Sequence, residues 1–229
     1  MPLVFTSPPI SLSTAHKFAA FFTFSYVGSL YLSKSARLFF KNGVTVDIRP
    51  GEERTKESEE RWRNDPEVIQ ARLLAASVST SMSVAAVFWL VRSVTPASEL
   101  KKDPTAYVWS AFARLGMTLD FKHGNSLYII LPCLVAPVLY LGPLYASSLC
   151  ETLPLQRRWN VKGSLLPLFT TWIGIRNYLL GPLTEEIVFR ACILAVYHMA
   201  GASRSKMIFL TPLAFGFGTF ASASKLRPV

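Results

Sequence analysis

Two long runs without a charged residue constrain the fold of this chain more than any other feature of its sequence. Leu73 to Val91 contains no charged side chain, and neither does Ser126 to Cys150. A helix needs about 20 mostly apolar residues to cross the hydrocarbon core of a bilayer. Because an unpaired backbone group is costly in lipid, such runs are predicted to form membrane-spanning helices.

Further apolar runs extend this prediction to a whole bundle. The fold class is predicted to be an all-α, polytopic transmembrane bundle of about six helices in a single membrane domain over 1–229, with candidate helices at 18–33, 73–91, 126–150, 164–181, 184–202 and 207–224. The composition agrees, since 51% of the residues are hydrophobic and only 17% are charged. The run nearest the N-terminus, at 18–33, lacks a small-residue cleavage pattern, so we expect it to be an uncleaved membrane anchor.

The connections between these runs carry most of the charge. Residues 51–65 are predicted to form a charged, solvated loop. The linker 92–125 contains an apolar stripe that predicts an interfacial amphipathic helix, formed by Tyr107, Trp109, Phe112 and Leu115. The net charge of +10 comes mainly from loops without interleaved aromatic residues. We therefore expect contact with an anionic lipid bilayer and no binding of nucleic acid.

The cysteines indicate neither a disulfide framework nor a metal site. All three of them, Cys133, Cys150 and Cys192, lie in apolar runs, and their spacing matches no metal-binding pattern. We expect them to pack in the interior, and we expect no metal and no cofactor.

The stretch GPLTEEIVFRA, residues 181–191, places two carboxylates and an arginine within an apolar region. An ionised carboxylate at membrane depth costs at least a few kcal/mol, so it normally faces a cavity or a partner. Arg190 follows Glu186 by four positions, which predicts an ion pair on one helix. Adjacent helical positions differ by about 100°, so Glu185 is expected to point elsewhere and could act as a general base on water.

The same stretch also suggests where its helix begins. Gly181 and Pro182 are read as the start, with Thr184 as the N-cap. On this reading the two glutamates could be first-turn acids that merely complement the positive end of the helix dipole. That structural alternative stands beside the catalytic one.

The pattern Arg-Asn-Tyr-x-x-Gly-Pro-Leu-Thr-Glu-Glu from Arg176, followed by Val-Phe-Arg-Ala-Cys, resembles the signature of the type II CAAX prenyl proteases, the Ras-converting enzymes. These belong to the intramembrane glutamate-dependent proteases, together with bacterial immunity-type relatives. The resemblance extends from about Leu73 to Phe217 and is densest from Trp172 to Leu194. It implies that Glu185 activates water, with Glu186 and Arg190 as the supporting pair.

The resemblance also implies a substrate and a location. The substrates would be farnesylated or geranylgeranylated CAAX proteins, such as Ras-type GTPases, from which the last three residues are removed. The enzyme would be a multi-pass protein of the endoplasmic reticulum membrane.

The likeness stops within the family's second motif, Phe-Gly-x-Ala-His. Gly218 and Thr219 stand where its alanine and histidine are expected, and a third motif, His-x-x-x-Asn or Asp, has no counterpart. We therefore expect a C-terminally truncated or mis-spliced form, incomplete at its C-terminal end, whose activity is in question. His198 lies roughly 20 Å from Glu185 along a helix and cannot replace the missing group. His16 and His123 fall in predicted linkers.

Two other functions remain open at this point. The chain could be a non-catalytic membrane protein that binds prenylated tails or partner proteins. It could also be a small transporter in which Glu185 and Glu186 carry protons or cations, although no inverted repeat or pair of half-helices supports that reading.

Overall fold

The structure, a computed structural model, describes residues 5, 7–32, 39, 60–118, 131, 134–135 and 137–223. Across these residues the chain is helical, and its extended pairing is limited to one isolated bridge between Phe39 and Arg61. The prediction of an all-α fold is confirmed.

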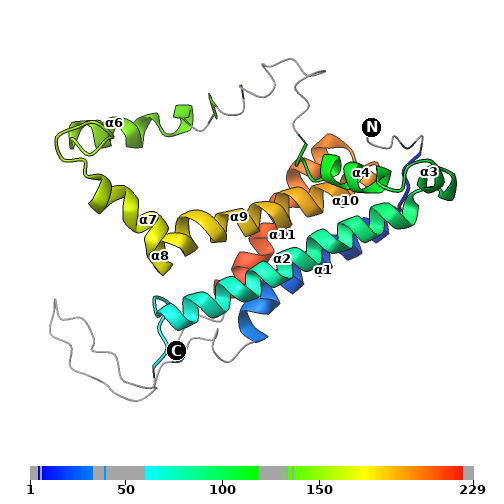
Figure 1. Ribbon diagram of the computed structural model, residues 1–229, viewed down its shortest axis with the longest axis horizontal. Coiled ribbons are helices and arrows are strands. Elements are labelled where there is room, and N and C mark those ends of the chain that lie inside the picture. The colour runs from blue at the N-terminus through cyan, green and yellow to red at the C-terminus, as the bar shows by residue number, and fades with distance from the viewer. Residues whose placement is uncertain are drawn as a thin grey trace.

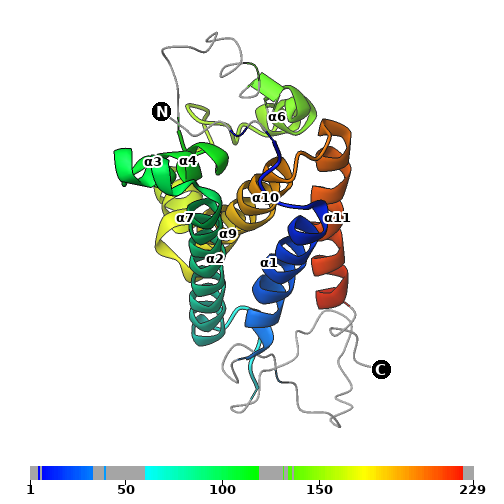
Figure 2. The ribbon, with the colours of Figure 1, turned by 90° about the vertical axis from the view of Figure 1, so that its right-hand side faces the viewer.

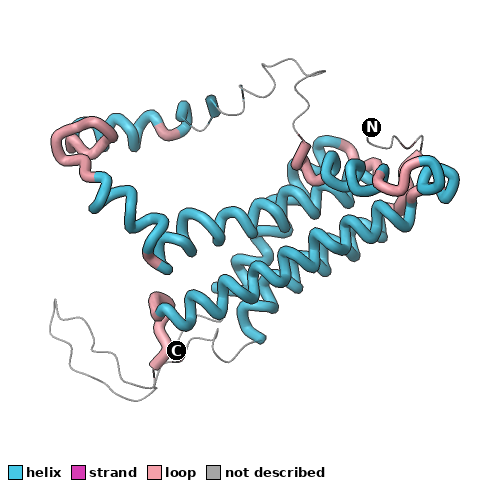
Figure 3. Tube along the Cα trace, in the orientation of Figure 1, coloured by secondary structure: helices cyan, strands magenta, loops and turns pink. Residues whose placement is uncertain are grey.

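Two long helices, α1 (Leu12–Leu32) and α2 (Pro66–Val94), run side by side. Asp65 and Pro66 begin α2 and Pro96 follows its end, while the 29 residues between contain neither an internal proline nor a glycine. The predicted run 73–91 lies inside α2. Among the described residues, α2 is the one helix whose own length and hydropathy suffice to cross a membrane. Figure 3 shows it as an unbroken helix.

The middle part of α2 has small polar residues inward and large apolar residues outward, whereas apolar residues such as Ile69 and Val91 are buried toward its two ends. Ser79, Thr80 and Ser83 are buried, whereas an outward stripe is exposed that consists of Leu74, Val78, Met82 and Trp89. The hydroxyl groups of Ser25 in α1 and Ser79 in α2 lie 3.0 Å apart. Small residues let helices approach closely in lipid, where apolar side chains gain nothing by turning inward. This pattern is that of an all-α membrane protein.

A third long helix carries the candidate site. It runs without interruption from Trp172 to Met199 through α8 (Trp172–Gly174), η2 (Ile175–Leu180), α9 (Gly181–Glu185), η3 (Glu186–Cys192) and α10 (Ile193–Met199). Before it lie η1 (Val161–Leu165) and α7 (Leu166–Thr170). The η segments are π-helical, with wider turns than the α segments.

The start of this long helix differs from the expectation. The backbone is extended at Thr171, whose hydroxyl accepts a hydrogen bond from the amide of Gly174 at 3.0 Å. Thr171 is therefore the N-cap, and the prediction of Thr184 as the N-cap is wrong. Gly181 and Pro182 do not begin the helix, because the wide turn of η2 leads directly into them. Figure 3 shows the short break between α7 and α8.

The last described helix, α11 (Arg204–Ala223), packs along α1, η3 and α10. The chain reverses at Gly201, which has a positive φ of 64° and so ends α10 at little steric cost. In Figure 2, α2, α1 and α11 stand next to one another in that order, with α9 and α10 behind them. Their contact region forms the core, in which Phe22, Val188 and Ile193 are fully buried.

The remaining helices are short. In the 92–125 linker the structure has α3 (Ala97–Lys102) and α4 (Ala106–Arg114), so a helix does form at the predicted apolar stripe. Within the predicted 126–150 helix, the described part contains α6 (Leu141–Leu149), which lies apart from α1 and α2 (Figure 1). Parts of this prediction and of the 51–65 loop, namely 126–130, 132–133, 136 and 51–59, lie outside the described residues.

Candidate active site

Glu186 and Arg190 form the ion pair that their spacing predicts. Arg190 Nη1 lies 3.0 Å from Glu186 Oε2, on successive turns of η3. Both side chains are more than half exposed, at 52% for the glutamate and 73% for the arginine. The pair therefore sits at the rim of the bundle.

Glu185 lies beside this pair, at the end of α9, and is half-buried. A cavity of about 160 Å³ is lined by Glu185, Glu186, Phe189, Arg190, Thr211 and Pro212. Both glutamates line this cavity. Although neighbouring helical positions point in different directions, Glu185 and Glu186 therefore share the same surroundings. The cavity lies between the site helix and α11, and its volume has room for several water molecules.

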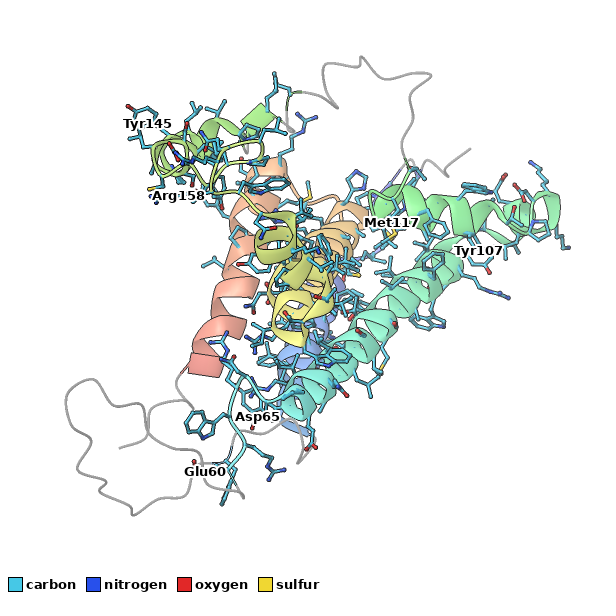
Figure 4. All side chains as sticks on the ribbon, turned by 60° about the vertical axis from the view of Figure 1, so that its left-hand side comes forward. Glu60, Asp65, Tyr107, Met117, Tyr145 and Arg158 are labelled. Atoms are coloured by element: carbon cyan, nitrogen blue, oxygen red, sulfur yellow. The ribbon has the colours of Figure 1, made fainter. Side chains whose placement is uncertain are left out.

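A second, more open cavity of about 330 Å³ lies on the other side of the ion pair. It is lined by Leu115, Met117, Glu186, Ile187, Arg190 and Ala191. Figure 4 shows Met117 where the chain leaves α4, next to α10. Arg190 and Glu186 thus form the wall between two cavities, one against α11 and one against the residues that follow α4.

The position of the glutamates removes one alternative reading. They lie in the middle of a helix that begins at Trp172, and not in its first turn. Their charges consequently do not complement a helix start. The two π-helical segments directly flank Gly181–Glu185, and such turns in other proteins are frequent at functional sites.

Steric crowding explains why position 181 is a glycine. A Cβ atom at this position would collide with the carbonyl oxygen of Arg176, five residues earlier in the wide turn. A glycine therefore allows the π-helical segment to pass into α9 directly before the two glutamates.

The first helix, α1, packs on the site helix although the two are far apart in the sequence, so no sequence motif predicts this contact. Tyr26 in α1 is buried, and its hydroxyl lies 2.9 Å from that of Thr184. Its ring also packs edge-to-face on Phe189, with centroids 5.5 Å apart. Tyr26 thus contacts the helix on both sides of Glu185 and Glu186.

The Arg176-Asn177 part of the motif does not face the cavity. Arg176 donates hydrogen bonds to the carbonyl of Arg63 at 2.8 Å and to the side chain of Asn64 at 3.2 Å. Its Nε also donates to Asn177 Oδ1 at 2.9 Å. These hydrogen bonds connect the beginning of the site helix to the turn before α2. Figure 4 shows Asp65 in this turn, at the start of α2.

The structure separates the histidines from the glutamates. His198 is exposed and lines a different cavity. His16 does not lie in a linker, as predicted, but in α1, where its Nδ1 is 2.9 Å from the hydroxyl of Tyr197. The predicted linker position of His123 lies outside the described residues, as does Cys133. Cys192 is buried and Cys150 is exposed, so the packing role predicted for Cys150 is wrong.

No sequence motif marks Thr211 as a site residue, although it lines the glutamate cavity. It is buried in α11, and its hydroxyl donates to the carbonyl of Met207 at 2.8 Å. Its position follows from the packing of α11 on η3, which no local pattern reveals.

Comparison with known proteins identifies relatives of the region around this site. The family model described as type II CAAX prenyl endopeptidase Rce1-like matches residues 167–226. A probable CAAX prenyl protease 2 from Schizosaccharomyces pombe is 30% identical over 154 residues, which cover 67% of this chain and 46% of the relative. No solved structure matches the chain.

Two mammalian proteins match a longer part of the chain. The CAAX prenyl protease 2 of Rattus norvegicus is 29% identical over 203 residues, covering 86% of this chain and 53% of the relative. That of Homo sapiens is 28% identical over 203 residues, covering 86% and 49%. The chain therefore spans about half the length of the curated relatives that it matches.

Proposed function

Because this chain belongs to the type II CAAX prenyl protease family, we propose that it carries the glutamate site of an endopeptidase that removes the C-terminal tripeptide from prenylated CAAX proteins. The observation that carries the proposal is the cavity in which Glu185 lies beside the Glu186–Arg190 ion pair. The substrates are farnesylated or geranylgeranylated proteins, including Ras-type GTPases, and the site of action is the endoplasmic reticulum membrane, which the chain crosses several times.

Glu185 is the general base in this proposal. It accepts a proton from a water molecule while the water oxygen adds to the carbonyl carbon of the prenylated cysteine. The tetrahedral intermediate then collapses, the peptide C–N bond breaks, and the proton passes from Glu185 to the amine of the departing tripeptide. The products are a protein ending in a prenylcysteine carboxylate and a free tripeptide.

Glu186 and Arg190 have a supporting role. Their 3.0 Å contact holds a positive charge at the edge of the cavity without leaving an uncompensated ion at membrane depth. Of the six residues that line this cavity, Arg190 alone carries a positive charge. It is therefore the lining group best suited to stabilise negative charge on the reacting carbonyl.

The surroundings of the cavity suit a lipidated substrate. Leu183, Ile208 and Phe209 have large apolar side chains that are at least half exposed, and the last two lie one turn before Thr211 and Pro212 in α11. A prenyl chain could pass along such a surface from the bilayer and place the neighbouring peptide bond at Glu185.

The test is release of the tripeptide from a farnesylated CAAX peptide by the full chain in liposomes, followed by mass spectrometry. Glu185→Gln is expected to lower the rate at least about a hundredfold, because it removes the proton acceptor. Glu67→Gln, an exposed acid in the first turn of α2, is the matched control and should leave the rate unchanged. Equal rates for the wild type and Glu185→Gln contradict the proposal.

Thr219 favours a second function. The family motif has a histidine at this position, and loss of such a partner commonly lowers the rate by orders of magnitude. The chain would then bind prenylated tails or partner proteins without cleaving them. Retention of the farnesylated peptide, with no tripeptide released by the wild type, selects this function over the first.

A further inference from the structure

A cavity of about 400 Å³ lies at the end of the bundle where α4 meets α10 and α11, away from the glutamates. Its lining consists of Ser110, Ala113, Arg114, Leu194, His198 and Met207. His198 stands 13 positions after Glu185 on the same continuous helix, a separation of about 20 Å at 1.5 Å per residue. The cavity is therefore separate from the proposed protease site.

We propose that this cavity binds the phosphate group of an anionic membrane phospholipid. The proposal rests on a buried hydroxyl group, a nearby positive charge and apolar walls, all of which a phosphate at the head of two acyl chains would use.

The hydroxyl group belongs to Ser110. Ser110 is fully buried, and its Oγ has no hydrogen-bond partner among the residues that the structure describes. Several other hydroxyl groups within the helices donate to a carbonyl four residues earlier, as those of Thr80 and Ser83 do. A buried hydroxyl without a partner is costly, so a group that accepts its proton within the cavity would be stabilised.

The positive charge comes from Arg114. It lies four positions after Ser110 in α4, so both side chains lie on the same face of that helix. The guanidinium group stacks over the ring of Phe5 at 4.9 Å, which holds its positive charge beside the cavity. None of the six lining residues is acidic, and His198 adds a further nitrogen donor.

Further basic residues lie close to the cavity in the sequence. Arg204 and Lys206 occupy the first turn of α11, directly before Met207, and both are exposed. Lys101 and Lys102 are exposed in α3, which packs on α4. Their field would raise the local concentration of anionic lipid at this end of the bundle.

The apolar parts of the surroundings favour a lipid over a free anion. Ala113, Leu194 and Met207 form apolar walls beside Arg114. On α4, the neighbouring Trp109 and Phe112 are exposed, as is usual for aromatic side chains at the boundary between lipid and water. Figure 1 shows α4 across the ends of α2 and α10, where a headgroup would lie if those helices span the bilayer.

The experiment measures binding of phosphatidic acid to the purified full chain in an uncharged detergent by native mass spectrometry, with phosphatidylcholine as the reference lipid. We expect the wild type to retain phosphatidic acid and Arg114→Gln to bind it about tenfold more weakly. His198→Ala, at an exposed position that does not support the core, should weaken binding about threefold. Ser110→Ala is expected to do the same.

Arg92→Gln is the matched control. Arg92 also stacks over an aromatic ring, that of Tyr107 at 5.6 Å, and belongs to the same end of the bundle without lining the cavity. Its affinity should stay within twofold of the wild type. If Arg92→Gln and Arg114→Gln weaken binding equally, or if neither Arg114→Gln nor His198→Ala weakens it, the proposal is overturned.

Two further arms identify the ligand. Inorganic phosphate at millimolar concentration is expected to leave lipid binding unchanged, and displacement of the lipid by it would make the cavity a site for free anions instead. Equal retention of phosphatidylcholine would contradict recognition of an anionic headgroup. None of these readouts uses peptide cleavage, so they stand or fall independently of the proposed protease function.

Discussion

The hydroxyl group of Tyr26 lies 2.9 Å from the hydroxyl group of Thr184, and this contact joins the first helix to the residue directly before Glu185. Thr184 has one hydroxyl proton, which points to the carbonyl oxygens of Leu180 at 2.8 Å and Gly181 at 3.0 Å. Tyr26 is therefore the donor in the contact. The bond links the site helix to α1 across 158 positions of sequence.

Removing that bond should destabilise the fold modestly. We expect Tyr26→Phe and Thr184→Val each to lower the free energy of unfolding by about 1 kcal/mol, as is typical of one hydrogen bond between helices. The double variant should lose less than the sum of the two, because both changes remove the same bond. Thermal unfolding in detergent micelles measures all three, and strict additivity would contradict the direct contact.

The Glu186–Arg190 pair should matter more for activity than for stability. Both side chains are more than half exposed, so Glu186→Gln or Arg190→Gln should cost less than about 1 kcal/mol of stability. In the proposed function, each should lower tripeptide release by at least about tenfold. The exposed pair Glu99–Lys102, at 3.3 Å, is the control, and neutralising it should alter neither quantity.

The buried serines of α2 should not tolerate larger side chains. Ser83 is fully buried on the inward face of α2. Ser83→Leu is therefore expected to destabilise the protein by about 1–3 kcal/mol through overpacking. Ser81, two positions earlier, is exposed and makes the same type of bond to a carbonyl four residues back. Ser81→Leu should therefore be neutral in micelles, and equal losses from both variants would contradict the inward-facing role of Ser83.

Gly174 should be intolerant of substitution because of the break before the site helix. A Cβ atom there would lie 2.6 Å from the carbonyl oxygen of Leu168, closer than real Cβ contacts occur. Gly174→Ala should lower the melting temperature by several degrees. Gly28 has open space in the same test, so Gly28→Ala should leave the temperature unchanged or raise it, since alanine favours helix.

Local spacing accounts for what the sequence predicts well. The uncharged run from Leu73 to Val91 lies within α2, and the four-residue interval between Glu186 and Arg190 does form an ion pair at 3.0 Å. Both depend only on the geometry of one helix, which is the same wherever the helix lies in the molecule.

Contacts between distant segments account for what is missed. Arg176 bonds to Arg63 across 113 positions, and nothing near either residue marks the other. The sequence pattern misplaces the start of the site helix because Gly181 and Pro182 usually interrupt helices, whereas the π-helical turn of η2 accommodates them here. Both errors come from interactions that a residue-by-residue pattern does not contain.

The packing of α1 against α10 and α11 has a consequence for biosynthesis. The ribosome releases α1 first and α11 last among the described helices, yet α11 lines the glutamate cavity and α1 packs on the helix that carries the glutamates. The first helix therefore lacks this late packing partner until nearly two hundred more residues have emerged. Agents that delay late translation should accumulate an inserted intermediate in which the helix with Glu185 and Glu186 is still open to proteases.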